Sequence, residues 1–460
     1  MHVTLVMPNY ADRRVQMPLG LGYLAAVLEK KGVDVKIVDM NVSDGKLKLE
    51  NTDIVGISCM IKTWPQSIAL ARQIKEKDAD LPIVFGGPHP SSVSEDCMRN
   101  EEIDFCVLGE GEVTAPELFE AIEKKKNFSK VKGIAYRKDG KVKHTKTRPL
   151  IQNLDTIPFP AYHLFDVKKY FYSVVGVEVT ERMPWGTMTT SRGCPNRCIF
   201  CFHAFGRTWR GRSPQNVKDE ITFLVEKYKL KEILFVDDNF TVSKSRVMEI
   251  CDKIKESGYD LTFRLQSGMR ANLMDYEMMK KMRETGLYRI SLGIESGSPQ
   301  MLKRMKKDIT LEQVRKAVAI CNKVGIEVVG FFVIGLPGET KQTAYQTMKF
   351  SKELNLKDAA FFTALPIPGT EFYNWSYGGG FLECNDWEKF DMFGGKSISR
   401  TEDLTTEQIN RLAKMAYRQF YFRPKTLLKK LASIKSIPEA RIAFDEVFKW
   451  FRPSKEKNSI

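Results

Sequence analysis

Short apolar runs alternate with amphipathic helical patterns along the first ~125 residues. Each apolar run has the length of a buried strand, and each intervening segment repeats apolar positions every three or four residues. This alternation is typical of a doubly wound (Rossmann-like) α/β domain, in which helices cover both faces of a parallel sheet. We predict strands at 3–7, 35–38, 54–58, 83–85 and 105–108, and helices at 18–31, 65–77 and 114–124.

The turns that follow these strands are the expected ligand-binding positions, because doubly wound sheets bind ligands outside the carboxyl ends of their strands. Two of the turns are rich in glycine, GGPHP at 86–90 and GEGE at 109–112. Paired glycines let the backbone come close to a flat or phosphorylated ligand. Taken singly, each sequence is more often only a tight turn.

A second alternating pattern begins after a connector. Residues 131–147 predict a hairpin that turns at Asp139-Gly140, and prolines then interrupt the chain up to Pro184. Further on, six strands separated by helices predict a full or partial parallel barrel, whose chemistry lies at the strand carboxyl ends. We expect these strands at 187–190, 233–236, 262–265, 289–292, 328–334 and 360–365.

The last 90 or so residues predict helices at 406–421, 424–432 and 438–451. The expected domains are therefore 1–130, a hairpin and linker at 131–185, a barrel at 186–370, and a helical, basic C-terminal region at 371–460.

The charge and composition of the chain exclude some classes of protein. The net charge of +15 is concentrated near one end, because residues 411–460 hold 13 Lys or Arg against 4 Asp or Glu. This favours contact with an anionic surface through the C-terminal region over a nucleic-acid-binding core. No apolar stretch is long enough to span a membrane and no signal peptide is recognisable, so the nine cysteines are expected to be reduced, in the cytoplasm.

Three of these cysteines form a metal-binding pattern directly after the first expected barrel strand. Cys194, Cys198 and Cys201 lie in the sequence SRGCPNRCIFCFH with CxxxCxxC spacing. Three thiolates on one loop can bind three irons of a 4Fe-4S cluster and leave the fourth iron open. Structural zinc sites take four ligands, and His203 is the only further candidate nearby. Spacing and position favour the cluster over zinc.

With Phe200 before its last cysteine, the motif resembles the signature of the radical S-adenosylmethionine (SAM) superfamily. The resemblance implies that the open iron binds the amino and carboxylate groups of SAM. Three later motifs agree in order and placement, although each is weak alone: FVDDNFT, GIESG and GFFVIGLPGE. By resemblance, they place Asp237 and Asp238 near the methionine part of SAM, Glu295 and Ser296 near its ribose and carboxylate, and Ile334 and Gly335 near its adenine.

The N-terminal region resembles the cobalamin-binding domain fused to many radical SAM barrels, a group that includes anaerobic magnesium-protoporphyrin cyclase and the hopanoid methylases. The resemblance rests on PLGLGYLAAVLEKKGVDVKIVD, GGPHP and VLGEGE. None of the five histidines lies in a DxHxxG pattern, so the resemblance implies cobalamin without a protein histidine on cobalt (His-off). His89 is the rival ligand, although its place between two prolines predicts an ordinary turn residue. The expected cobalamin contacts are Met60, in a loop beside the lower face of the corrin, and Gly86, Gly87, His89, Gly109 and Glu110.

The resemblance implies an enzyme that uses SAM and methylcobalamin to methylate an unactivated carbon of a hydrophobic small molecule: a tetrapyrrole pigment, a lipid or a natural product. Radical oxidative cyclisation remains an alternative, and a non-catalytic corrinoid or iron-sulfur sensor is the alternative of another class. We expect a reducing partner such as ferredoxin or flavodoxin, no nucleic acid, and at most peripheral membrane contact. For the aromatic residues at 417–421, packing against the barrel is the simpler interpretation.

Overall fold

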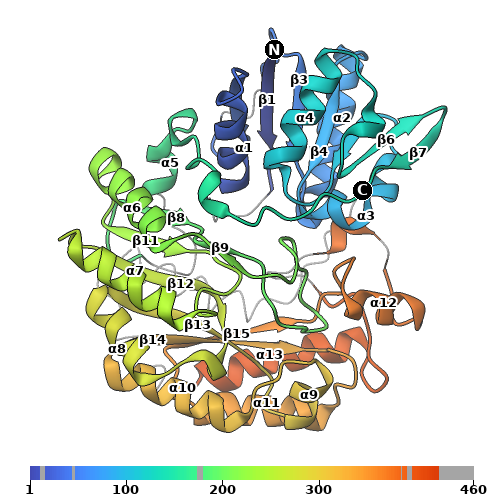
Figure 1. Cartoon of the computed structure of the whole chain (residues 1–460). Coiled ribbons are helices and arrows are strands. Elements are labelled where there is room, and N and C mark those ends of the chain that lie inside the picture. Colours follow the sequence, from blue (N-terminus) through green and yellow to red (C-terminus); the bar gives the residue numbers. More distant parts are fainter. Residues whose placement is uncertain (11–15, 44–46, 173–179, 385, 391–395, 424–460) are drawn as a thin grey trace.

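Two parallel sheets, one from each half of the chain, organise the molecule (Figure 1). The computed structural model describes residues 1–10, 16–43, 47–172, 180–384, 386–390 and 396–423. In Figure 1 the N-terminal sheet and its helices form the upper part and the second sheet forms the lower part. The predicted fold class, a doubly wound domain followed by a partial parallel barrel and a helical C-terminal region, is confirmed.

The N-terminal sheet has the strand order β2-β1-β3-β4-β5-β6-β7, and its first five strands are parallel. The order reverses direction between β1 and β3, as in flavodoxin-like folds, so the ligand crevice is expected at the carboxyl ends of these strands. The five parallel strands are β1 (His2–Met7), β2 (Asp34–Asp39), β3 (Ile54–Ser58), β4 (Ile83–Gly86) and β5 (Phe105–Val107).

The three predicted helices of this domain are present, and a fourth lies between β4 and β5 where the sequence suggested only a turn. Pro is tolerated in the first turn of a helix because the amide it lacks would have no partner there. GGPHP therefore begins a helix at Pro88 rather than forming an isolated turn. The helices are α1 (Leu19–Glu29), α2 (Trp64–Lys77), α3 (Pro88–Met98) and α4 (Gly111–Glu123).

The predicted hairpin is present as β6 (Ile134–Lys138) and β7 (Lys141–His144), with Asp139 and Gly140 at its turn. It is part of the N-terminal sheet rather than of the linker, because β6 pairs antiparallel with β5. The short helix α5 (Val167–Phe171) follows in the connector.

The second sheet is a partial barrel of six parallel strands in the order β15-β14-β13-β12-β11-β8. Among the described residues β15 does not pair with β8, so the barrel is open. Its strands are β8 (Trp185–Met188), β11 (Glu232–Phe235), β12 (Thr262–Met269), β13 (Leu287–Glu295), β14 (Glu327–Ile334) and β15 (Asp358–Thr363).

Amphipathic helices cover the outer face of this sheet and bury their apolar side chains in one large core. Several begin with a Ser, Thr or Asp side chain that accepts a backbone amide of the first turn, as in α10, where Thr310 and Gln313 form a capping box. The helices are α6 (Pro214–Tyr228), α7 (Lys244–Glu256), α8 (Tyr276–Thr285), α9 (Pro299–Arg304), α10 (Leu311–Val324) and α11 (Lys341–Glu353).

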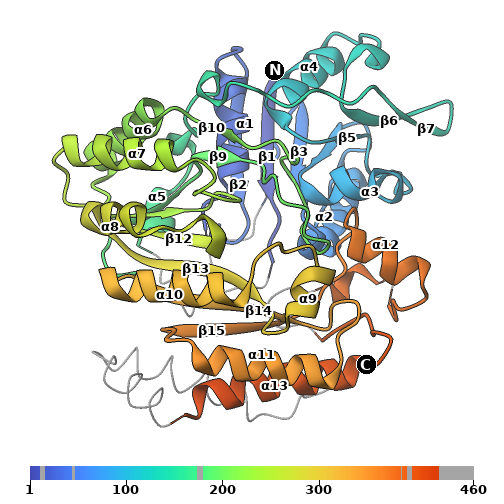
Figure 2. The ribbon, with the colours of Figure 1, turned by 60° about the horizontal axis from the view of Figure 1, so that its bottom comes forward.

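The described C-terminal region consists of α12 (Glu371–Gly378), a short 3-10 helix, η6 (Trp387–Lys389), and α13 (Thr406–Tyr421). Helix α13 lies beside α11 and packs against β15, as Figure 2 shows. Tyr417, Phe420 and Tyr421 contact the core of the second sheet, which confirms the simpler interpretation for these residues. The helices predicted at 424–432 and 438–451 lie outside the described residues. Where the structure is described, no helix has the length and apolar character needed to cross a membrane.

Candidate active site

The cysteine motif occupies a loop, residues 193–209, between two very short strands, β9 (Ser191–Arg192) and β10 (Arg210–Gly211). These strands pair antiparallel and so close the base of the loop. Gly193 has a φ of 81°, and a Cβ there would lie 2.4 Å from the carbonyl oxygen of Thr208. Only glycine lets the two ends of the loop come this close.

Positive charge lies beside the central cysteine. Cys198 is buried, and Nη1 of Arg270 lies 3.7 Å from its sulfur. A hydrogen bond from the Cys201 thiol, together with the charges of Lys307 and Arg270, lowers the pKa of Cys198 to about 6 despite its burial. This environment favours the thiolate, which is the form that binds metal.

The three cysteines lie on one short loop, and in a 4Fe-4S cluster each thiolate binds a different iron. Asn196 donates to the sulfur of Cys194 at 3.1 Å, an amide-to-sulfur bond of the kind that tunes such clusters.

The aspartates after β11 hold the backbone that leads into the loop. Asp237 is buried and accepts hydrogen bonds from the amide and hydroxyl of Thr190 and from the hydroxyl of Ser191. Asp238 accepts the amide of Gly193 at 3.0 Å. Burial raises the pKa of Asp237, although the hydroxyl donors oppose this effect. The structure thus brings both predicted residues to the cluster loop.

Glu295, at the carboxyl end of β13, forms a buried ion pair with Lys307, whose Nζ lies 2.7 Å from Oε1. Glu295 has a φ of 65°, a conformation uncommon for a residue with a side chain. Ser296 is fully buried and bonds Thr347 at 3.0 Å. Lys307 was not predicted, because nothing in the surrounding KRMKKD distinguishes it from its surface neighbours.

The remaining predicted SAM residues lie at the same end of the barrel sheet. Ile334 ends β14 and is fully buried, and Gly335 follows it with a φ of 98°. A Cβ at Gly335 would lie 2.7 Å from the side chain of Ile409 in α13. Phe200 packs against the core of the barrel. Arg270 was not predicted, although its position directly after β12 is the signal that could have identified it.

On the N-terminal side, Gly86 and Gly109 face open space, since a Cβ at either position would meet no atom within 4 Å. Gly87 is tightly packed, with a φ of 106° and its would-be Cβ 2.8 Å from the carbonyl oxygen of Cys59. Met60, next to Cys59, is half-buried. Two of the predicted glycines at the carboxyl edge of this sheet are therefore accessible to a ligand, and the third is fixed by packing.

His89 differs from the sequence expectation. It lies in the first turn of α3 rather than in a loop, and it is 98% buried between Trp64 and Trp387, with ring centroids 4.8 and 5.4 Å away. Its Nε2 has no hydrogen-bond partner among the described residues. Burial lowers the pKa of His89 to about 4, so the imidazole is neutral near pH 7. A buried ring nitrogen without a partner is costly, so a polar atom of a bound corrinoid would fit here as its partner.

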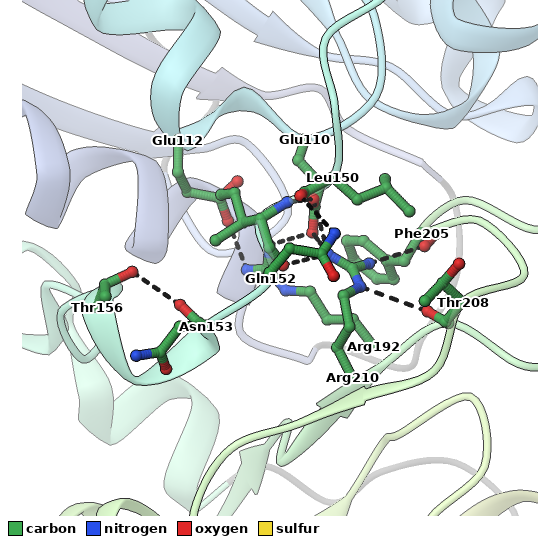
Figure 3. Close-up of polar contacts among 12 residues, drawn as sticks. Glu110, Glu112, Leu150, Gln152, Asn153, Thr156, Arg192, Phe205, Thr208 and Arg210 are labelled. Atoms are coloured by element: carbon green, nitrogen blue, oxygen red, sulfur yellow. Dashed lines mark hydrogen bonds and ion pairs between the residues drawn. The ribbon is translucent and has the colours of Figure 1, made fainter.

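Glu110 joins the two halves of the molecule (Figure 3). Its carboxylate accepts hydrogen bonds from Arg192 and Arg210, which flank the cysteine loop, and from the amide of Ile151. Elsewhere, a Cβ at Gly369 would contact both Phe202 of the cysteine loop and Ser92 of α3. The carboxyl edge of the N-terminal sheet therefore lies against the cysteine loop.

Comparison with known proteins defines the class. The family model described as "Radical SAM superfamily" matches residues 188–351, and the one described as "B12 binding domain" matches residues 14–119. The protein is a radical SAM enzyme that carries a B12-binding domain. These matches confirm both parts of the predicted resemblance.

Individual relatives narrow the class to a family. An uncharacterized methyltransferase of Pyrococcus horikoshii is 36% identical over 445 residues, covering 93% of this chain and 94% of the relative. Cytidylyl-2-hydroxyethylphosphonate methyltransferase of Streptomyces wedmorensis is 32% identical, covering 80% and 79%. Anaerobic magnesium-protoporphyrin IX monomethyl ester cyclases and hopanoid methylases also match. The chain belongs to the family of radical SAM enzymes with a cobalamin-binding domain.

Solved structures agree with this fold. The cobalamin-dependent SAM radical enzyme OxsB, with aqua-cobalamin and SAM bound, matches with a TM-score of 0.76 at 20% identity, over 97% of this chain and 70% of that one. At this identity the likeness supports the fold alone.

Proposed function

We propose that this chain is a cobalamin-dependent radical SAM methyltransferase that methylates an unactivated carbon of a hydrophobic small molecule. The proposal rests on one observation: Glu110, at the carboxyl edge of the N-terminal sheet, bonds directly to Arg192 and Arg210, the residues on either side of the cysteine loop. A corrinoid at the first site and a cluster with SAM at the second would therefore stand close together. Methyl transfer through both cofactors needs this arrangement, because the reacting groups have to be held in position and away from water.

Cys194, Cys198 and Cys201 hold the 4Fe-4S cluster, and Arg270 and Lys307 stabilise its negative charge. When bound, the cluster and SAM supply a 5'-deoxyadenosyl radical, which can take hydrogen from a carbon that no side-chain base can deprotonate. The charges of Lys307 and Arg270 lower the pKa of Cys198 and so favour its thiolate, the form that binds metal.

SAM lies against the carboxyl ends of β13 and β14. Glu295 and Ser296 contact its polar parts, Ile334 and Gly335 contact its adenine, and Phe200 packs beside the cluster. Asp237 and Asp238 contribute by fixing the backbone at the start of the cysteine loop, as their hydrogen bonds to Thr190, Ser191 and Gly193 support.

Met60, Gly86, Gly87 and Gly109 would hold cobalamin, and no protein histidine would bind its cobalt. His89 contributes a hydrogen bond from its buried Nε2 to a polar atom of the corrinoid. In the electron paramagnetic resonance spectrum of the cob(II)alamin form we expect no nitrogen splitting from His89, and His89→Ala should weaken cobalamin binding at least tenfold. Splitting that disappears in His89→Ala would instead make His89 a cobalt ligand.

The first experiment is anaerobic. Reconstituted protein with SAM, cobalamin and a low-potential reductant should form 5'-deoxyadenosine, and Cys198→Ala should abolish this product together with the cluster absorbance. Cys251→Ala, which alters a buried cysteine of α7 away from the loop, is the matched control. Catalytic turnover of SAM would exclude the non-catalytic sensor. Wild-type protein that binds zinc through the same cysteines and cleaves no SAM would refute the proposal.

Oxidative cyclisation is the competing enzyme activity, and the cyclases among the relatives keep it open. The two reactions differ in the fate of the SAM methyl group. Product from cells supplied with methyl-deuterated methionine should be heavier by one labelled methyl group if the enzyme is a methyltransferase. A cyclase would give an unlabelled product.

We expect a cytoplasmic ferredoxin or flavodoxin to supply the electron for SAM cleavage. The basic residues after 423 lie outside the described residues, and we propose that they contact anionic lipid peripherally. Pelleting with phosphatidylglycerol vesicles, compared between the full chain and a chain ending at residue 423, tests that contact.

A further inference from the structure

The base of the cysteine loop carries two buried arginines in an unusual position. Arg192 on β9 and Arg210 on β10 are direct cross-strand partners, and their side chains are 6% and 3% exposed. Like charges directly opposite one another destabilise a strand pair, and burial increases the cost. A two-residue ribbon has few other contacts to offset this, so the arginines need anionic partners.

Those partners come from the other half of the molecule. Glu110, 4% exposed, lies with its Oε1 2.9 Å from Nη1 of Arg192 and its Oε2 2.9 Å from Nη1 of Arg210. Glu112 pairs with the other terminal nitrogen of Arg192. We call these four side chains, Glu110, Glu112, Arg192 and Arg210, the interdomain ion-pair cluster. Its two positive and two negative charges balance.

Both arginines also contact residues of the cysteine loop. Arg210 donates to the carbonyl oxygens of Phe205 and Thr208, near the loop's second end. Arg192 lies over the ring of Phe205 at 5.0 Å and over that of Tyr23 from α1 at 5.5 Å. Figure 3 shows Glu110 and Glu112 pointing toward the side chains of Arg192 and Arg210. One carboxylate of the cobalamin-binding domain therefore connects to both ends of the loop that carries the cluster cysteines.

We infer that Glu110 is a positioning residue that fixes the cysteine loop relative to the cobalamin-binding sheet. It acts through Arg192 and Arg210 rather than by touching a cofactor. The carboxylate that the sequence suggested for cobalamin instead accepts three protein donors. This inference rests on the proposed function, because the alignment matters only where the two cofactors work together.

The test needs no identified substrate, because the holoenzyme consumes SAM in two ways. When the methyl group passes to reduced corrinoid, S-adenosylhomocysteine is released. Reductive cleavage at the cluster, with one electron from titanium(III) citrate and a hydrogen atom from the buffer, gives methionine and 5'-deoxyadenosine. The first product requires the corrinoid and SAM to be aligned, whereas the second requires only the barrel. The ratio of the two products therefore reports alignment.

In Glu110→Gln we expect the ratio of S-adenosylhomocysteine to 5'-deoxyadenosine to fall at least about tenfold, since small misplacements of reacting groups have large effects on rate. Iron content and hydroxocobalamin affinity should stay within twofold of wild type. Amide hydrogen exchange of the holoprotein should accelerate within residues 193–209. Glu120→Gln is the matched control, because Glu120 on α4 also pairs two cations, Lys124 and Lys126, but at an exposed position.

Two results would overturn the inference: an unchanged product ratio with unchanged exchange, or weakened cobalamin affinity with unchanged exchange, which would make Glu110 a corrinoid contact. If Glu110→Gln does not fold, Arg192→Lys keeps the charge but cannot bridge Glu110 and Glu112, and the same measurements then decide. If the wild type forms 5'-deoxyadenosine but no S-adenosylhomocysteine, the proposed methyl transfer fails. Hydrogen exchange within 193–209 still tests Glu110 in that case.

Discussion

Glu339 provides a sharp test of the barrel's electrostatics. It ends the GLPGE turn after β14, and its side chain is completely buried. Its carboxylate accepts hydrogen bonds from the hydroxyl of Thr343 and the amide of Gly335, but within the described part of the chain it forms no ion pair. Burial therefore dominates and raises its pKa from 4.5 to about 7.

The sign of the effect follows from proton binding. Between pH 4.5 and 7 the folded protein keeps the proton of Glu339 while the unfolded chain loses it, so this group's contribution to stability falls as pH rises. A difference of about 2.5 pKa units at roughly 1.4 kcal/mol each gives about 3.5 kcal/mol over the whole titration. Gln has nearly the same shape as Glu and carries no charge. Glu339→Gln should therefore not lose this stability as the pH rises.

The assay is anaerobic urea unfolding followed by circular dichroism at pH 5, 6, 7 and 8. We expect Glu339→Gln to gain stability relative to wild type as the pH rises. The difference between their free energies of unfolding should grow by about 2.5 kcal/mol from pH 5 to pH 8, because the rest of the effect lies below pH 5. Glu249→Gln, at an exposed position on α7, should follow wild type at every pH. A gap that stays constant with pH, or that widens toward pH 5, would refute the reasoning.

Two further paired substitutions test the fold. Gly87→Ala should lower the thermal midpoint of the cobalamin-free protein, because its φ is 106° and the new Cβ would lie 2.8 Å from the oxygen of Cys59. Gly86→Ala meets no atom within 4 Å, so it should leave the midpoint unchanged while weakening cobalamin binding in a spectroscopic titration; equal midpoints for the two variants would contradict this. Phe420→Ala should destabilise the protein by about 3–5 kcal/mol in urea unfolding, since it leaves a cavity under α13. Phe422→Ala, at a side chain 41% exposed, should cost less than about 1 kcal/mol.

The local pattern of apolar and polar residues predicted most of the secondary structure. All predicted strands of the first sheet are present, because a buried parallel strand needs a short apolar run and little else. The helix over Thr406–Tyr421 has the predicted bounds, with Thr405 and Gln408 as its capping box. Helix α3 was missed, because the two prolines and two glycines of GGPHP resemble a turn unless the packing of Gly87 against Cys59 is known.

The sequence likewise identified some residues of the site and missed others. The cysteine spacing identified the cluster loop and, by resemblance, the chemistry, since three ligands on one short loop are a local property of the chain. Lys307 was not identified, because a lysine beside a thiolate has no local pattern that differs from a surface residue. Arg270 was not identified either, although its position directly after β12 could have indicated it.

The sequence by itself therefore determined the two sheets, the cysteine loop and the class of enzyme, all of which depend on neighbours within a few residues. Only the tertiary structure decided that Glu110 pairs with Arg192 and Arg210, at sequence separations of 82 and 100 residues, and that His89 is buried between Trp64 and Trp387. The physical reason is that ion pairing and burial depend on distance in space, and a chain brings such residues together only through packing.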